Sequence, residues 1–331
     1  MVLAGYTSVG EFHYLHHGPA GRPYDDRNEM GTAVIAAARD AGLRITLLDA
    51  CYLRGGFDRV LDVVQRRFGD GDVDGWARRV GELRETDGVR IGAAVHSVRA
   101  CSPPEIAAVA DIAGDRPLHA HVSEQPAENE GCLATYGKTP TGVLADSGAL
   151  GPGFTAVHAT HLTDADIELL ADSTVCACPT TERDLADGVG PFRRLLDHGA
   201  GLMVGSDSNA VVDGLEETRS LELHERLISG ERGVLDVEEL LTALTNHQPL
   251  GWTDAGSIAV GNRADLVTVD LESVRLAGIT FDTMLATVLY AAAGADVATV
   301  TVDGVDRVTD GAYQAGDVVA EFDALIPRLF A

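Results

Sequence analysis

Lysine is nearly absent from this sequence of 331 residues: Lys138 is the only one, and arginine supplies the rest of the 25 cationic side chains. Acidic residues number 51, so the formal net charge is −26. This charge argues against nucleic-acid binding, which needs a basic surface, and against binding to an anionic membrane. A small anionic substrate is still allowed, because a few cations can dominate the potential inside one pocket.

Cysteine is scarce, and its positions fit no metal or redox motif. The count of five is odd, and the spacings match neither a zinc ribbon nor a CxxC pair. The five residues are Cys51, Cys101, Cys132, Cys176 and Cys178. Cys176 and Cys178 alternate on a predicted strand, where buried thiols are the preferred interpretation. We expect reduced thiols in a cytoplasmic protein.

Several further motifs are lacking. No stretch approaches 18 uninterrupted apolar residues, and no basic segment followed by an apolar run opens the chain, so we expect neither a membrane helix nor a signal peptide. No GxGxxG follows the first predicted strand, and there is no Walker A or GxSxG motif. Dinucleotide binding, a P-loop and serine hydrolysis are therefore unsupported.

Short apolar runs alternate with helix-like segments as far as about residue 250. The predicted strands lie near residues 6–14, 44–52, 89–97, 117–124, 154–160, 174–179 and 200–208. The predicted helices include residues 28–41, 58–68, 105–113, 164–172 and 215–229. Alternation of this kind predicts a parallel sheet in an α/β fold.

Polar side chains gather where the predicted strands end. They are His13, Tyr14, His96, Arg99, His121, Glu124, His158, His161 and Asp207. Reactive residues at the carboxyl ends of many strands are typical of a (β/α)8 TIM-type barrel. Seven strands are visible where closure needs eight, so we expect a barrel that lacks its first strand, over residues 1–254.

The pattern changes after residue 254. Residues 256–270 predict a turn and two short strands, and residues 297–306 predict a hairpin around Asp303-Gly304. We expect residues 255–331 to form the C-terminal part of a small β-sandwich appended to the barrel.

The run His119-Ala-His121-Val-Ser-Glu124 is the strongest local signal. Residues 119 and 121 share one face of a strand, so two imidazoles could bind a metal, with Glu124 as a proton carrier. His158 and Asp207 follow at later strand ends, and both are good ligand types for zinc. Each has a structural alternative: His158 as a hydrogen-bonded core histidine, and Asp207 as a helix N-cap.

Four of these runs resemble the aminohydrolase branch of the amidohydrolase superfamily: HAHVSE (119–124), VHATHLTD (157–164), CPTTERDLADG (178–188) and GSDSN (205–209). Within that branch, EFHYLHH (11–17), HSVR (96–99), HVSEQPAE (121–128) and CPTTE (178–182) are similar to formimidoylglutamate deiminases. The resemblance runs from about residue 3 to the C-terminus. The segments CPTTE and HSVR discriminate most, because related nucleobase and nucleoside deaminases carry other residues there.

The resemblance implies a metal-dependent hydrolase with one divalent ion, zinc being the expected one. His121 and Asp207 would be metal ligands, and Asp207 would also accept a proton from the attacking water. Glu124 would carry a proton to the imino nitrogen of the substrate, and His158 would stabilise the attacked centre. The implied reaction is hydrolysis of N-formimino-L-glutamate to N-formyl-L-glutamate and ammonia, a step of histidine degradation.

The resemblance also implies how a small anionic substrate is held. His96 and Arg99 would bind the glutamate carboxylates, and Tyr14 would help to place the substrate. For Arg99 the alternative interpretation is a surface ion pair. His119, His161, His13, His16 and His17 have no implied role beyond packing or support. A homodimer is compatible with the family.

One departure from the family concerns the first barrel strand, which normally ends in a metal-binding His-x-His. Nothing before Tyr6 supplies it, so we expect this chain alone to bind zinc weakly and to turn over slowly. The favoured explanation is a translation start assigned at an internal Met. Two alternatives stay open: a non-catalytic remnant or partner subunit, and another aminohydrolase that acts on a guanidine, amidine or purine.

Overall fold

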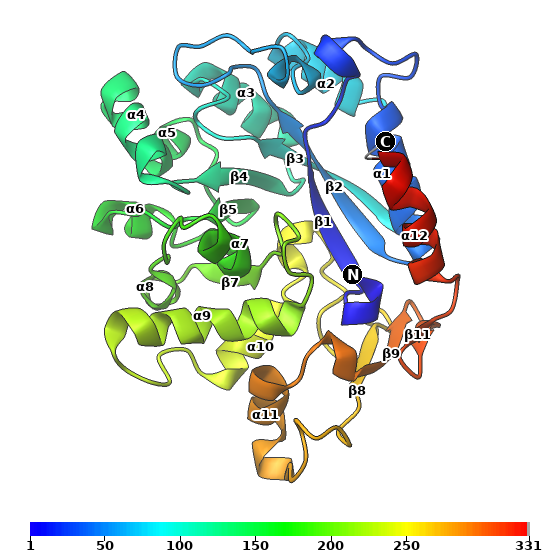
Figure 1. The fold of residues 1–331 in the computed structure, drawn as a ribbon. Helices are drawn as coiled ribbons and strands as arrows, with labels where there is room; N and C mark the ends of the chain where they lie inside the picture. The colour runs from blue at the N-terminus through cyan, green and yellow to red at the C-terminus, as the bar shows by residue number, and fades with distance from the viewer. Residues whose placement is uncertain (330–331) are drawn as a thin grey trace.

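A computed structural model describes residues 1–329, and its largest element is an open, curled sheet of seven parallel strands (Figure 1). The strands are β1 (Ser8–His13), β2 (Arg44–Cys51), β3 (Val89–Val95), β4 (Leu118–Val122), β5 (Phe154–His158), β6 (Thr174–Ala177) and β7 (Gly201–Val204). They pair in sequence order, with β1 and β7 at the two edges. All eight residues of β2 are buried, as expected for a parallel strand covered on both faces.

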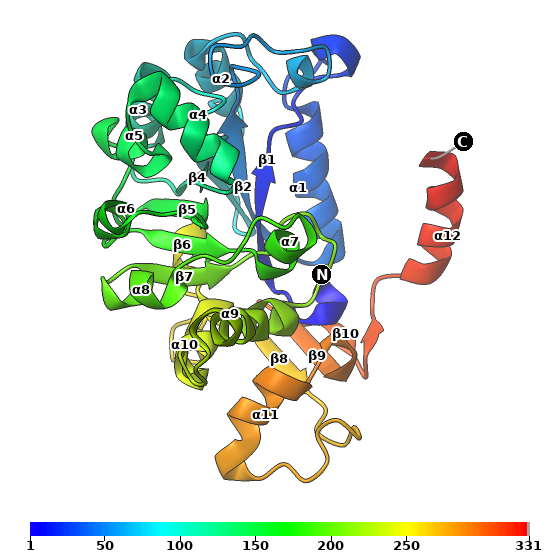
Figure 2. The ribbon, with the colours of Figure 1, turned by 60° about the vertical axis from the view of Figure 1, so that its left-hand side comes forward.

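Helices follow the strands and pack around this sheet (Figures 1 and 2). They are α1 (Glu29–Ala41), α2 (Val73–Val80), α3 (Pro103–Ala113), α4 (Pro126–Tyr136), α5 (Pro140–Asp146), α6 (Asp164–Leu169), α7 (Pro179–Asp184), α8 (Phe192–Asp197), α9 (Gly214–Ser229) and α10 (Val237–Thr245). Local sequence sets their starts. For example, Ser102 and Glu105 form a capping box at α3, and Asp213 accepts hydrogen bonds from the first amides of α9.

A four-stranded antiparallel sheet forms the appended part, in the order β11-β10-β9-β8. Its strands are β8 (Leu266–Val269), β9 (Val297–Val302), β10 (Val305–Thr309) and β11 (Ala312–Tyr313). Val2, in the 3-10 turn η1 (Val2–Ala4), packs into the apolar core of this sheet. The N-terminus accordingly lies beside β8 and β9 in Figure 1. The division of the chain at residue 254 stays a prediction.

Two helices lie in the described part of the chain after β8. They are α11 (Met284–Ala291) and α12 (Val318–Leu329), and α11 contacts α9 and α10. Figure 2 shows α12 standing apart from the two sheets on an extended connection. The remaining 3-10 turns are η2 (Pro19–Gly21), η3 (Gln65–Arg67), η4 (Gln248–Leu250), η5 (Phe281–Thr283) and η6 (Gly294–Asp296). In the part of the chain described, no helix is long and apolar enough to cross a membrane.

The expected incomplete α/β barrel with an appended β-structure is confirmed, and so is the hairpin at Asp303-Gly304. The predicted helix at 58–68 is wrong: only η3 is helical there. The carboxylate of Asp62 accepts the amides of Val64 and Gln65, which favours a turn instead of a longer helix. Residues 256–270 contain one strand, β8, where two were expected, and α11 and α12 were not foreseen.

Candidate active site at the strand ends

The carboxyl ends of β3, β4, β5 and β7 bring four of the predicted site residues together. The ring of His96 lies 5.0 Å from that of His121, which lies 5.5 Å from the ring of His158, centroid to centroid. The carboxylate of Asp207 lies 4.0 Å from Nε2 of His158. Parallel strands make this possible because their carboxyl ends share one edge of the sheet.

His121 has one ring nitrogen already engaged. Its Nδ1 lies 2.8 Å from the backbone carbonyl of His96. A carbonyl can only accept, so Nδ1 must carry the proton and Nε2 keeps its lone pair. Burial lowers the pKa of His121 well below its ordinary value, and the neighbouring His96 and His158 lower it further. A neutral His121 with a free Nε2 is the form that binds a metal.

His158 is buried among three carboxylates. Its Nδ1 lies 3.4 Å from Oε1 of Glu182, and its Nε2 lies 3.8 Å from Oε1 of Glu124 and 4.0 Å from Oδ2 of Asp207. Burial alone would lower its pKa, but the hydrogen bond to Glu182 and the charges of Glu124, Glu182 and Asp207 outweigh burial. Together they raise the pKa of His158 to about 9.

A donor set suited to a divalent metal is present at this edge. One donor atom from each of His121, His158 and Asp207 lies within 4.8 Å of the other two. Two imidazole nitrogens and a carboxylate oxygen are common ligands for zinc. Asp213 is the N-cap of α9, so the alternative interpretation of Asp207 as that cap is wrong.

Arg99 is the cation of the site, and two carboxylates share it. Its guanidinium lies 3.2 Å from Oε2 of Glu124 and 3.8 Å from Oε1 of Glu128. Oε2 of Glu128 accepts the backbone amide of Glu124, so Glu128 contacts both partners. Burial raises the pKa of Glu128 to about 7, although the charge of Arg99 opposes the rise. Arg99 therefore lies inside the site, paired with carboxylates of the strand-end motif, and not in a surface ion pair.

Aromatic rings form one wall beside these groups. The ring of Tyr14 lies 5.2 Å from that of His96 and 5.1 Å from that of Phe68, and the ring of Tyr52 lies 4.4 Å from that of His96. Phe12 packs 4.2 Å from His121. Burial lowers the pKa of His96 to about 3, and the charge of Arg99 lowers it too, so His96 is neutral.

The backbone is strained at the same edge. Ser123, His158, Ala159 and Asp207 all have positive φ, at 51°, 68°, 53° and 39°. Non-glycine residues rarely adopt this conformation, which costs about 1–3 kcal/mol at each position. Such strain persists where surrounding structure enforces it, and it is enriched at functional sites.

The other histidines take structural contacts. Nε2 of His119 lies 2.9 Å from the carbonyl of Pro249, and Nε2 of His161 lies 2.6 Å from the carbonyl of Asp187. His119 is not among the donor atoms grouped with His121, and its contact with a backbone carbonyl fits the packing role expected for it. The two side chains share a face, but His119 is the second residue of β4 and its ring nitrogen contacts a carbonyl of η4.

A second group of metal-ligand types is found among His13, His16 and Asp49. Both oxygens of Asp49 are occupied, because Arg79 donates to them at 2.7 and 2.8 Å and Nε1 of Trp76 donates at 3.1 Å. The guanidinium also repels a metal cation. This group is therefore a buried ion-pair network and not a metal site.

Sequence reasoning missed three contributors to the site. Glu182 and Glu128 lie within quoted motifs, but helix-borne glutamates gave no signal of burial. Tyr52 follows β2, so the rule that selected the other strand-end residues would have found it. All five cysteines are buried and unpaired.

Comparisons with known proteins identify the family. The Amidohydrolase family matches residues 1–306. This chain belongs to the amidohydrolase family. Formimidoylglutamate deiminase of Pseudomonas aeruginosa is 36% identical over 329 residues, which cover 95% of this chain and 72% of that protein. A 5-methylthioadenosine/S-adenosylhomocysteine deaminase of Moorella thermoacetica is 32% identical over 82% of this chain and 63% of its own length.

Solved structures show the same fold. An amidohydrolase from Brucella melitensis is 34% identical, with a TM-score of 0.92 over 100% of this chain and 76% of that one. An adenosine deaminase from Xanthomonas campestris with bound zinc is 25% identical, with a TM-score of 0.84 over 99% of this chain and 72% of that one. The family is thus established, whereas the substrate differs among its relatives.

Proposed function

We propose that this protein hydrolyses the formimino group of N-formimino-L-glutamate to give N-formyl-L-glutamate and ammonia. The observation that carries the proposal is the position of Arg99, a partly exposed guanidinium 3.2 Å from Glu124 and beside His96. A fixed cation next to the proton-carrying groups suits a substrate with carboxylates. The similarity to formimidoylglutamate deiminase over 95% of the chain supports the same substrate.

His121 and Asp207 would hold a divalent metal, and we propose zinc because the donors are imidazole nitrogen and carboxylate oxygen. When bound, such an ion supplies a water of lowered pKa, which is a nucleophile near neutral pH. The two residues fit such an ion, because Nδ1 of His121 is bonded to the carbonyl of His96 and Nε2 is left free for the metal.

The carboxylates and His158 would move and hold protons. Asp207 would accept a proton from the attacking water, and Glu124 would deliver one to the imino nitrogen. Water adds to the formimino carbon, and the proton of the new hydroxyl then passes through these carboxylates to the same nitrogen. The carbon–nitrogen bond breaks, ammonia leaves and the hydroxyl oxygen becomes the formyl oxygen. His158 faces both carboxylates through Nε2, so it can donate a hydrogen bond to the attacked centre.

Substrate placement would fall to Arg99, His96 and Tyr14. Arg99 supplies the charge and would exchange its contact with Glu124 for a substrate carboxylate. His96 is neutral and would contribute a hydrogen bond. Tyr14 lies in the aromatic wall, where burial and the charges of Asp207 and Glu124 raise the pKa of its hydroxyl.

The test is ammonia release from N-formimino-L-glutamate by the purified chain with added zinc, together with calorimetric binding of the substrate. Arg99→Gln is expected to raise KM and Kd at least tenfold, and Arg99→Lys to recover part of the loss. The proposed substrate is refuted if the chain at high concentration shows no binding of N-formimino-L-glutamate and no ammonia release.

A purine nucleoside is the second candidate. The aromatic wall of Tyr14, Tyr52 and Phe68 would suit stacking of a base, and a relative that is 32% identical is a methylthioadenosine deaminase. It predicts deamination of 5′-methylthioadenosine with a higher kcat/KM than N-formimino-L-glutamate. It also predicts that Arg99→Gln leaves that reaction within twofold of the parent, since the nucleoside carries no carboxylate.

A further inference from the structure

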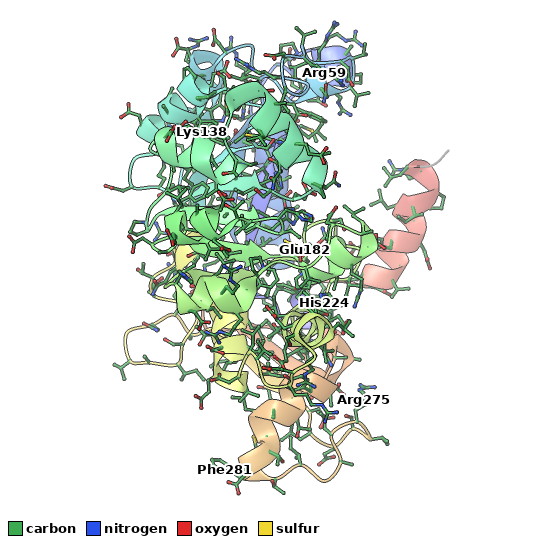
Figure 3. All side chains as sticks on the ribbon, turned by 90° about the vertical axis from the view of Figure 1, so that its left-hand side faces the viewer. Arg59, Lys138, Glu182, His224, Arg275 and Phe281 are labelled. Carbon is green, nitrogen blue, oxygen red and sulfur yellow. The ribbon has the colours of Figure 1, made fainter. Side chains whose placement is uncertain are left out.

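Glu182 is a fully buried carboxylate that the proposed reaction leaves without a task. It closes the CPTTE segment and lies in α7, directly after β6. Only 1% of the residue is exposed. Figure 3 labels it in the middle of the molecule, far from Lys138 and Arg275 toward the two ends. A carboxylate buried this deeply needs compensating partners.

Both partners of Glu182 converge on one oxygen. The backbone amide of Cys178 donates to Oε1 at 2.9 Å, and Nδ1 of His158 lies 3.4 Å from the same oxygen. Oε2 is buried with no hydrogen-bond partner among the residues described. The amide anchors Oε1, so the contact with His158 is set by the backbone where β6 passes into α7.

This contact places a proton on Nδ1 of His158. An ionised carboxylate only accepts, so a bond to Glu182 requires a proton on Nδ1. Nε2 is then the nitrogen that faces Glu124 and Asp207, at 3.8 and 4.0 Å. The ring is itself buried, so no solvent competes for Nδ1.

We propose that Glu182 is the positioning residue of His158: it holds the proton on Nδ1 and thereby turns Nε2 toward the reacting groups. The kinetic consequence rests on the proposed function, whereas the protonation of Nδ1 does not. Partners that orient a functional imidazole in this way typically affect activity 10- to 100-fold.

A metal bound by His158, Cys178 and Glu182 is the competing arrangement, because their donor atoms also lie within 4.8 Å of one another. Contact with Cys176 and burial raise the pKa of Cys178 well above its ordinary value, so the thiol stays protonated. A protonated thiol is a poor metal ligand. In that arrangement Nδ1 would carry no proton, so one measurement separates the two.

The experiment is long-range proton–nitrogen NMR on the full chain labelled with ¹⁵N-histidine. The signals of His158 are identified by their loss in His158→Asn. They are recorded at a pH where their own titration shows that the ring carries one proton. We expect the proton on Nδ1 in the parent chain and in Glu182→Gln, whose amide oxygen can still accept, and a mixture of tautomers in Glu182→Ala.

Glu217→Gln is the matched control. Glu217 is also a buried glutamate, and it holds α7 by accepting the amide of Thr180 at 3.0 Å, but it is not bonded to His158. It is expected to keep the parent pattern. A parent chain without a proton on Nδ1 overturns the proposal, and this result needs no variant to fold.

Kinetics give a second readout. Glu182→Ala is expected to lower kcat at least tenfold with KM within twofold, and Glu182→Gln to recover most of kcat. Equal kcat in Glu182→Ala and the parent would overturn the positioning role. If N-formimino-L-glutamate is not a substrate but Nδ1 is protonated as expected, the proposed function fails and the positioning of His158 stands.

Discussion

Among residues 1–329, two clusters each combine two histidines and one aspartate, and they differ in what their donor atoms already do. We call them the strand-end cluster (His121, His158, Asp207) and the Asp49 network (His13, His16, Asp49, with Arg79). In the Asp49 network a guanidinium and an indole occupy both carboxylate oxygens. In the strand-end cluster the side chain of Asp207 is 31% exposed, and its backbone is strained.

The difference shows that residue types alone do not define a metal site. A ligand needs a free lone pair, and a cation nearby removes the attraction for a metal. The Asp49 network satisfies its own charges and so contributes to the fold. The strand-end cluster leaves Nε2 of His121 and the carboxylate of Asp207 available, which is the property that a catalytic metal requires.

The largest effect is expected from breaking the Asp49 network. Arg79→Leu leaves Asp49 and Asp70 buried without their shared cation and should lower the free energy of unfolding by about 3–5 kcal/mol. Urea unfolding followed by circular dichroism measures the change. The control is Arg39→Ala, whose ion pair with Asp40 is exposed and should contribute no more than about 1 kcal/mol. Equal effects would show that the network does not stabilise the fold.

The next effect separates the clusters by metal affinity. His121→Ala and Asp207→Ala should each weaken zinc binding by at least about 100-fold, because each removes a proposed direct ligand. His16→Ala should leave it within about threefold. Titration of the folded variants with zinc, followed by calorimetry, gives the comparison. Weaker zinc binding in His16→Ala than in His121→Ala would mean that the metal binds at the Asp49 network and not at the strand-end cluster.

The sequence allowed the strand-end cluster to be anticipated because its members obey a simple rule. His121, His158 and Asp207 lie at or just after the ends of predicted strands, and parallel strands bring their carboxyl ends together. The fold class followed from the same alternation. The Asp49 network was not foreseen, because its partners come from β1, β2 and the segment around α2, and nothing in their spacing links them.

The other features that the sequence did not reveal are contacts between side chains on different helices and strands. Glu128 and Glu182 were quoted within motifs, yet their contacts with Arg99 and His158 depend on how α4 and α7 pack. His119 shares a strand face with His121, but its neighbour is the carbonyl of Pro249, 130 residues away. Such long-range contacts are decided by tertiary structure and leave no local pattern.

Acidification should weaken the Asp49 network. Burial lowers the pKa of His13 to about 4, and the neighbouring His16 and Arg79 also lower it, although Asp49 opposes them. The unfolded chain has the ordinary value of about 6.5, so it binds more protons than the folded chain between these pH values. The stabilisation is therefore complete above pH 6.5 and is lost as the pH falls toward 4, by up to roughly 3 kcal/mol.

Urea unfolding at pH 7, 5.5 and 4.5 tests this dependence. His13→Gln is neutral at every pH, so its stability should fall less steeply than that of the parent over the same range. Parallel pH dependences in the parent and His13→Gln would show that other groups cause the loss.

The smallest effect is expected where the strand-end cluster meets its aromatic wall. Tyr14→Phe keeps the ring that packs against Phe68 and His96 and removes only the hydroxyl. A hydrogen bond contributes about 1 kcal/mol, so KM for N-formimino-L-glutamate should rise about fivefold with stability unchanged. Tyr52→Phe is the matched control, because the hydroxyl of Tyr52 accepts from Gln65 and is not free for a substrate. A rise in KM for Tyr52→Phe but not for Tyr14→Phe would mean that the substrate contacts the hydroxyl of Tyr52 and not that of Tyr14.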